Sequence, residues 1–137
     1  MSKRWTIAVD FDGVIHQYTS KFDIDELDPP MPGAFEWLEE MVKHFTVVIH
    51  SCRLTPHGDE EDTYGRELEM ARALLVVEEG FLEHGLPQEV LDELEFWQKP
   101  GKPTALVYID DRGFRFEGTF PSKKQIHQLR PWKYKEG

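Results

Sequence analysis

Two pairs of aspartates follow apolar segments of this chain, at the points where those segments end. The first pair begins after residues 5–9 and the second after residues 105–109. Short continuous apolar runs are typical of buried parallel strands, and the carboxyl ends of such strands meet at one edge of a sheet. Carboxylate oxygens are the ligands that Mg²⁺ prefers. The sequence therefore predicts a magnesium site at that edge, built from Asp10, Asp12, Asp110 and Asp111.

Each pair taken alone also fits an ordinary turn, because Asp and Gly favour turns. Four carboxylates gathered without a cation would repel one another and raise one another's pKa. Both pairs, however, come after apolar strands. That coincidence favours a metal site over two unrelated turns.

A third apolar segment, Val47–Ile49, ends in the polar residues His50 and Ser51. Three strands that each end in polar or acidic residues are typical of an α/β sheet that holds a metal and a phosphate group at its strand ends. The first two strands flank a helix, and such a unit is almost always right-handed. The strands are expected at residues 5–9, 45–49 and 105–109.

Helical spacing of apolar residues predicts helices between these strands. The first opens at Pro32-Gly33, the second runs over residues 64–84 and the third over residues 88–97. The expected apolar stripe of the second helix is Leu68, Ala71, Leu74, Leu75 and Phe81. A short strand at 114–116 and a helix starting near Pro121 complete the order.

This order predicts one α/β domain over residues 1–137. We expect a three-layer Rossmann-like parallel sheet with helices on both faces. Residues 16–31 are expected to form a loop or flap, and residues 119–137 a C-terminal tail.

The segment from Asp10 to Val14 resembles the first motif of the haloacid dehalogenase superfamily of phosphohydrolases. Ser51 after its apolar strand is similar to the second motif, Lys102 to the third, and Asp110-Asp111 to the fourth. The four motifs come in the family's order and cover residues 5 to about 118. Together they are far more specific than a single Asp-x-Asp.

The resemblance implies a role for each of these residues. Asp10 would attack phosphorus to form an aspartyl-phosphate, and Asp12 would protonate the leaving oxygen and then activate water. Mg²⁺ would be bound by Asp10, the backbone carbonyl of Asp12, and Asp110, with Asp111 as a ligand through water or a neighbour of the ligands. Two further residues would contact the phosphoryl group, Ser51 through a hydrogen bond and Lys102 by neutralising charge.

Two positions remain open. Lys99 lies three residues before Lys102 and is a rival for the third motif, although a solvated loop charge is the better interpretation of Lys99. Arg53 could grip a substrate phosphate with two hydrogen bonds or pair with one of the many acids, and the two interpretations are equal.

Many relatives carry a cap domain, but the segments between these motifs are too short for one, so the resemblance implies a capless enzyme. An open site needs a large substrate, a neighbouring subunit, or its own flap and tail to exclude water. The expected substrate is a phosphomonoester, on a nucleotide, a polynucleotide end or another large molecule.

The composition of the chain limits the kinds of partner that we expect it to bind. A net charge of −10 argues against a broad nucleic-acid groove, although lysines and arginines gather in the tail. No segment is long and apolar enough for a membrane span, and a single cysteine, Cys52, fits a cytoplasmic protein. Either a monomer or a homo-oligomer is compatible with the sequence.

Two other functions share part of this pattern. A receiver domain of a response regulator also gathers acids, a hydroxyl and a lysine around Mg²⁺, but it lacks Asp-x-Asp-Gly-Val at the end of its first strand. A non-catalytic interaction domain is the second alternative. None of the expected catalytic residues is missing, which favours the enzyme.

Overall fold

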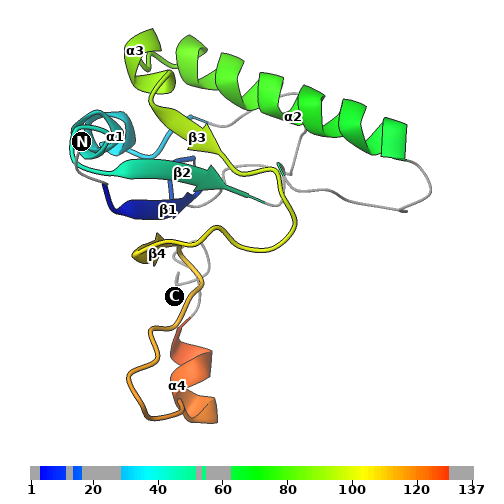
Figure 1. Ribbon diagram of the computed structural model, residues 1–137. Coiled ribbons are helices and arrows are strands. Elements are labelled where there is room, and N and C mark those ends of the chain that lie inside the picture. The colour runs from blue at the N-terminus through cyan, green and yellow to red at the C-terminus, as the bar shows by residue number, and fades with distance from the viewer. Residues whose placement is uncertain (1–3, 12–13, 17–28, 52–53, 55–62, 130–137) are drawn as a thin grey trace.

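The computed structural model describes residues 4–11, 14–16, 29–51, 54 and 63–129. Four parallel strands form a single sheet in the order β3-β2-β1-β4. Their bounds are β1 Thr6–Asp10, β2 Thr46–His50, β3 Leu94–Phe96 and β4 Val107–Ile109. Figure 1 shows the strands side by side, with β1 in the middle of the sheet between β2 and β4. The α/β class and the parallel sheet predicted from the sequence are confirmed.

The side chains of the two central strands are buried whichever face of the sheet they belong to. Ile7, Ala8 and Val9 of β1 are almost fully buried, and Val47 to Ile49 of β2 are equally so. This is why both strands read as continuous apolar runs rather than as alternating patterns. The backbone N–H of Phe11 donates to the carbonyl of His50 at 3.2 Å, which extends the pairing just past the end of β1.

In the described part of the chain the sheet is accompanied by four helices: α1 Ala34–Met41, α2 Thr63–Glu83, α3 Gln88–Leu91 and α4 Lys123–Gln128. The helix expected after Pro32-Gly33 is confirmed as α1, and Gly33 adopts φ +81° just before it. The helix expected near Pro121 is confirmed as α4, where the Ser122 side chain accepts a hydrogen bond from the N–H of Gln125.

The hydrophobic core lies on one face of the sheet. It joins Ile7 and Val9 of β1 to Leu38 of α1, Phe81 of α2 and Leu91 of α3. Side chains alternate across a strand, so Ala8, between these two, points to the opposite face. Helices α1, α2 and α3 therefore share one face, and the expected helices on both faces are not seen in the described part of the chain.

Two local predictions were wrong. The helix expected over 88–97 ends at Leu91, and residues 94–96 form β3 instead. Residues 114–116 form no strand. The helix expected over 64–84 is confirmed as α2, whose core side is Ala73, Val77 and Phe81, while Leu68 and Leu75 are each 55% exposed.

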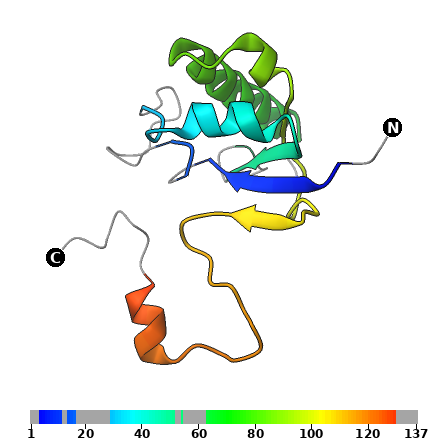
Figure 2. The same cartoon turned by 90° about the vertical axis from the view of Figure 1, so that its left-hand side faces the viewer.

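The connection from β3 to β4 runs between opposite edges of the sheet and carries Pro103, which is buried. After β4 the chain leads away from the sheet to α4, as Figure 2 shows. The flap expected over 16–31 lies mostly outside the described residues. Its two ends are joined, because His16 and Pro30 form an antiparallel bridge.

Candidate functional site

The carboxyl ends of β1, β2 and β4 lie next to one another. In the parallel register Asp10 aligns with His50 of β2, and Val9 aligns with Ile109 of β4. The residue after Ile109 is Asp110, so Asp10 and Asp110 occupy neighbouring positions of adjacent strands. The sheet thus brings together two sequence positions that are a hundred residues apart.

Alternation along the strands places these residues on one face. Tyr108 aligns with Ala8, and Asp10 aligns with His50. Asp10, His50, Tyr108 and Asp110 therefore belong to the face opposite the helices. That face is the one on which a site at this edge would open.

Asp110 holds the turn that follows β4. Its Oδ1 accepts a hydrogen bond from the backbone N–H of Arg112 at 2.9 Å and another from the N–H of Gly113. A Cβ atom at Gly113 would lie 2.8 Å from Asp110 Oδ1. Glycine is needed there because of this close approach. The turn interpretation and the site interpretation of Asp110 are therefore compatible.

Asp111 has an unusual environment for a carboxylate. Both of its side-chain oxygens are inaccessible to solvent, and neither has a hydrogen-bond partner among the described residues. An ionised carboxylate without a partner is strongly destabilising in such a position. Its oxygens are thus suited to a bound cation.

Lys102 is placed by two aromatic residues that the sequence analysis did not single out. Its Nζ lies 4.9 Å from the centroid of the Tyr108 ring. The Tyr108 hydroxyl donates to the carbonyl of Pro103 at 2.6 Å, and Trp97 Nε1 donates to the carbonyl of Gly101 at 2.9 Å. The residues on both sides of Lys102 are therefore held.

His50 connects this lysine to the strand ends. Its ring packs edge-on against Tyr108, with centroids 6.4 Å apart, and its Nε2 is buried without a partner in the described structure. Burial lowers the pKa of His50; Asp110 opposes this effect, and Lys102 lowers the pKa further. Burial, the largest of these effects, thus favours the neutral imidazole.

Lys99, the rival of Lys102, lies elsewhere. Its Nζ is 5.6 Å from the centroid of the Trp97 ring, and no contact of Lys99 with a strand end is seen among the described residues. Lys102 also acts on the pKa of His50, a residue of the strand-end edge, whereas Lys99 does not.

The remaining predicted residues are placed only in part. Ser51 directly follows β2 and is buried, and its carbonyl accepts from the N–H of Leu54 at 3.0 Å. Asp12 and Arg53 lie outside the described residues. Among the residues that the structure does describe, no three His, Cys, Asp or Glu side chains are grouped closely enough to hold a metal ion. Asp10, Asp110 and Asp111 thus share an edge without forming a closed set of ligands.

A surface hollow of about 610 Å³ adjoins this edge. Its lining includes Lys102, Tyr108, Asp110, Gly113, Phe114 and Arg115. No local sequence pattern indicates the part played by Tyr108, because its partners lie in the loop before β4 and in β2. Its position two residues before Asp110 is the only local hint.

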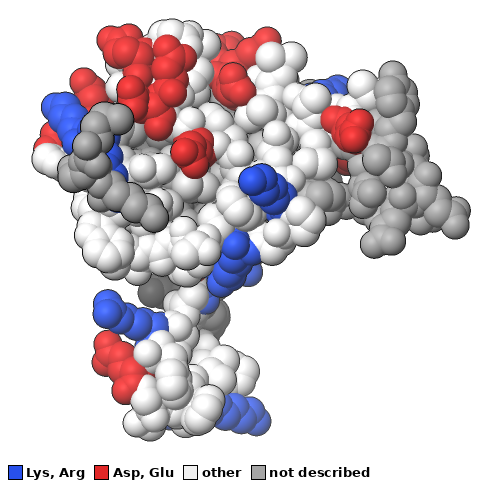
Figure 3. All heavy atoms as spheres, viewed as in Figure 1, with Lys and Arg blue, Asp and Glu red and all other residues white. Residues whose placement is uncertain are grey.

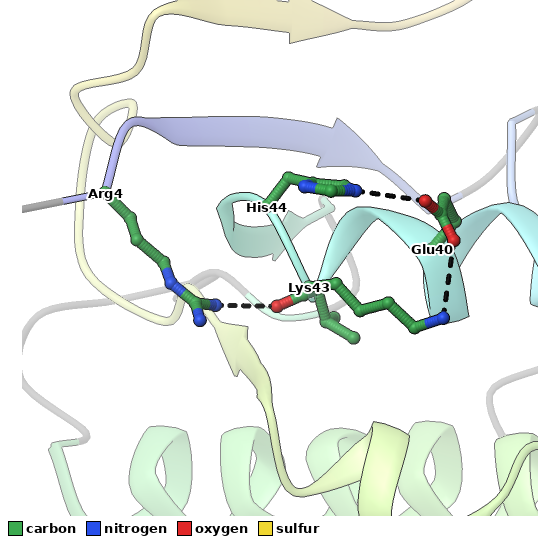
Figure 4. A network of polar contacts seen from close by, with 5 residues as sticks. Arg4, Glu40, Lys43 and His44 are labelled. Atoms are coloured by element: carbon green, nitrogen blue, oxygen red, sulfur yellow. Dashed lines mark hydrogen bonds and ion pairs between the residues drawn. The ribbon is translucent and has the colours of Figure 1, made fainter.

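A separate polar network lies at the other end of β1, away from the strand-end edge. Arg4 donates to the carbonyl of Val42 at 2.7 Å, and Glu40 contacts Lys43 and His44 (Figure 4). These contacts tie the start of β1 to the end of α1. They are structural and do not extend the candidate site.

Within the described residues, no helix combines the length and apolar character needed to cross a bilayer. The chain matches no family model, no curated protein and no solved structure.

Proposed function

We propose that the protein is a Mg²⁺-dependent phosphohydrolase of the haloacid dehalogenase type that cleaves a phosphomonoester through an aspartyl-phosphate. The observation that supports this proposal is the register of the sheet, in which Val9 pairs with Ile109 at the carboxyl ends of two parallel strands, and Asp10 and Asp110 are the residues that follow. Ligands in open α/β sheets bind outside this edge. The sheet and its strand order are those of a general α/β protein, so the family assignment rests on the motifs.

The residues present suit a hard cation. Asp111 offers two buried carboxylate oxygens that have no described partner, and Asp10 and Asp110 lie on the same edge. We assign Asp10, Asp12, Asp110 and Asp111 to the Mg²⁺ site. The ion would neutralise charge on the phosphoryl group and on Asp10.

The proposed reaction has two steps. A carboxylate oxygen of Asp10 attacks phosphorus, and the bond from phosphorus to the leaving oxygen breaks as Asp12 gives that oxygen a proton. Water then attacks the aspartyl-phosphate, Asp12 takes its proton, and inorganic phosphate and the Asp10 carboxylate are released. Ser51 would hydrogen-bond a phosphoryl oxygen throughout.

Lys102 is the group that we assign to charge neutralisation beside the metal. An anion attacking another anion needs fixed positive charge, and preorganised charge is worth most when it cannot move. The contacts of Tyr108 and Trp97 around Lys102 support this assignment. They also favour Lys102 over Lys99. The proposal also includes a capless architecture and a cytoplasmic location.

The test is hydrolysis of p-nitrophenyl phosphate in the presence of excess Mg²⁺. Asp10→Asn should abolish turnover and leave the circular dichroism spectrum unchanged, and excess chelator should abolish wild-type turnover. Asp92→Asn, an exposed aspartate of the helical side, is the matched control and should keep full activity. Turnover by Asp10→Asn at the wild-type rate would reject the assignment.

A further inference from the structure

The segment after β4 exposes apolar rings that a folded domain normally covers. We call residues 112–129 the arm. Phe116 is 53% exposed and Phe120 is 83% exposed, and their ring centroids lie 4.8 Å apart. The arm has no extensive contact with any other element of the described structure. Large exposed aromatic surfaces of this kind mark binding sites.

The arm also differs from the rest of the protein in charge. It carries four basic residues and one acidic residue, although the whole chain has a net charge of −10. The four are Arg112, Arg115, Lys123 and Lys124, and the acid is Glu117. In Figure 3 acidic side chains gather over the helical part of the molecule, and basic ones are seen both there and in the part that holds β4 and α4. The overall charge therefore conceals a basic surface.

The part of the arm nearest to β4 belongs to the candidate site. Phe114 and Arg115 line the same hollow as Lys102 and Asp110. From this hollow, exposed phenyl rings and basic side chains continue along the arm to α4. A ligand that begins at the strand-end edge could therefore follow the arm without a break.

We infer that the arm binds a single-stranded polynucleotide and presents its terminal phosphate to the candidate site. The placing of the phosphate rests on the proposed function, whereas binding by the arm does not. Single strands are bound without sequence preference by a combination of aromatic rings, on which bases stack, and basic groups that follow the backbone. The arm offers both kinds of group next to each other. Pairing of two arms in a dimer would match the rings, but it would bring basic side chains of like charge together.

The first experiment measures binding, by fluorescence anisotropy of 5′-fluorescein-labelled dT12. Lys123→Ala/Lys124→Ala should weaken binding roughly tenfold and make it less dependent on salt, because fewer counterions are released. Phe116→Leu/Phe120→Leu should weaken it at least fivefold, about the loss expected when a base loses its stacking partner. Phe116→Tyr/Phe120→Tyr keeps both rings and should restore binding.

Matched controls lie on the helical side of the molecule. Lys43 is an exposed lysine beside α1, and Leu75 is a half-exposed leucine of α2. Lys43→Ala and Leu75→Ala should leave dT12 binding within twofold of the wild type. All of the substituted side chains are exposed, so circular dichroism should show the same fold in every variant.

The second experiment separates substrate binding by the arm from catalysis at the candidate site. With a dT12 that carries a terminal phosphate, the arm variants should raise KM about tenfold, because they lose binding energy that is the same in substrate and transition state. Their kcat/KM for p-nitrophenyl phosphate should not change. Binding of dT12 without any phosphatase activity would reject the proposed function and leave the arm as a polynucleotide-binding surface.

Three results would overturn the inference about the arm. The first is a wild-type protein that hydrolyses p-nitrophenyl phosphate but does not bind dT12. The second is binding that the arm variants do not weaken. The third is a wild-type dimer, seen by light scattering, that becomes monomeric in Phe116→Ala/Phe120→Ala, because the rings would then be covered by a second copy of the chain.

Discussion

Tyr108 supports Lys102 from two directions. The ring of Tyr108 lies 4.9 Å from the Lys102 ammonium, and its hydroxyl holds the carbonyl of Pro103, the next residue, at 2.6 Å. The same ring packs against His50 at the end of β2. One side chain of β4 thus links a loop lysine to the strand-end edge. In the proposed enzyme Tyr108 would fix the position of Lys102, the cation that we assign to charge neutralisation.

The prediction is that Tyr108→Leu lowers kcat/KM for p-nitrophenyl phosphate about tenfold, because an unsupported lysine loses part of its preorganisation. Tyr108→Phe keeps the ring and should lose less than threefold. Lys102→Met should lose about a hundredfold or more. In a Lys102→Met background, Tyr108→Leu should have no further effect, because the two residues act as one unit.

The control for this cycle is Phe35→Leu, a half-buried ring that packs on the helical face. It should lower stability without changing kcat/KM at 20 °C or below. If Tyr108→Leu has its full effect in the absence of Lys102, Tyr108 does not act through the lysine. Its role would then be structural.

The effect of Asp111→Asn on the stability of the protein should depend on whether Mg²⁺ is bound. The carboxylate oxygens of Asp111 are buried without a described partner, so Asp111→Asn should stabilise the metal-free protein by relieving an uncompensated charge. Mg²⁺ should raise the melting temperature of the wild type by several degrees, because a ligand that binds only the folded state stabilises it. Mg²⁺ should raise the melting temperature of the Asp111→Asn variant much less.

Differential scanning calorimetry with and without Mg²⁺ measures both effects. Asp92→Asn, an exposed aspartate next to α3, is the control and should behave as the wild type under both conditions. If Mg²⁺ does not change the melting temperature of the wild type, Asp111 is not part of a Mg²⁺ site.

The first half of the sheet could be predicted from the sequence because its signals are local. Ile7–Val9 and Val47–Ile49 are continuous apolar runs, and the helix between them has one clear stripe. The meeting of Asp10 and Asp110 also followed, because parallel strands have to end at a common edge. This is the part of the candidate site that depends on topology alone.

The rest depends on contacts between distant residues. β3 has only three residues and lies in an acidic segment where Val90, Leu91 and Leu94 have helical spacing, so the pattern favoured a helix. Phe114 and Phe116 alternate as in a strand, but no described strand pairs with them. The contacts of Tyr108 with Lys102 and His50 depend on side-chain positions that no sequence pattern contains.

The buried and the exposed apolar residues of helix α2 should contribute differently to the free energy of unfolding. Phe81 is 3% exposed and contacts the rings of Phe11 and Phe35, whereas Leu75 is 55% exposed. Phe81→Ala should therefore lower the free energy of unfolding by about 3–5 kcal/mol, the usual loss for a buried phenyl ring. Leu75→Ala should change it by less than about 0.5 kcal/mol.

Urea denaturation of both variants, followed by circular dichroism, gives these values. If helical spacing alone decided which side chains are buried, both variants should show large losses. Similar losses in the two variants would therefore contradict the packing described above.

The contact of Glu40 with His44 and Lys43 gives a prediction about pH (Figure 4). His44 Nε2 lies 3.0 Å from one carboxylate oxygen, and Lys43 Nζ donates to the other at 3.4 Å. The hydrogen bond with His44, and then that with Lys43, lowers the pKa of Glu40 below the ordinary value of 4.5. In a carbon-detected NMR titration the Glu40 carboxyl should have a midpoint below 4.5, and His44→Gln should raise it.

The same shift fixes the sign of the effect on stability. Because the folded state binds this proton less tightly than the unfolded state, the pair stabilises the protein above pH 4.5, and this contribution is lost as the pH falls through the lowered pKa. The difference in unfolding free energy between wild type and Glu40→Gln should be constant from pH 5 to 6 and shrink at lower pH. It should also shrink in 1 M NaCl, because the groups are exposed to solvent. A difference that grows as the pH falls would contradict the lowered pKa.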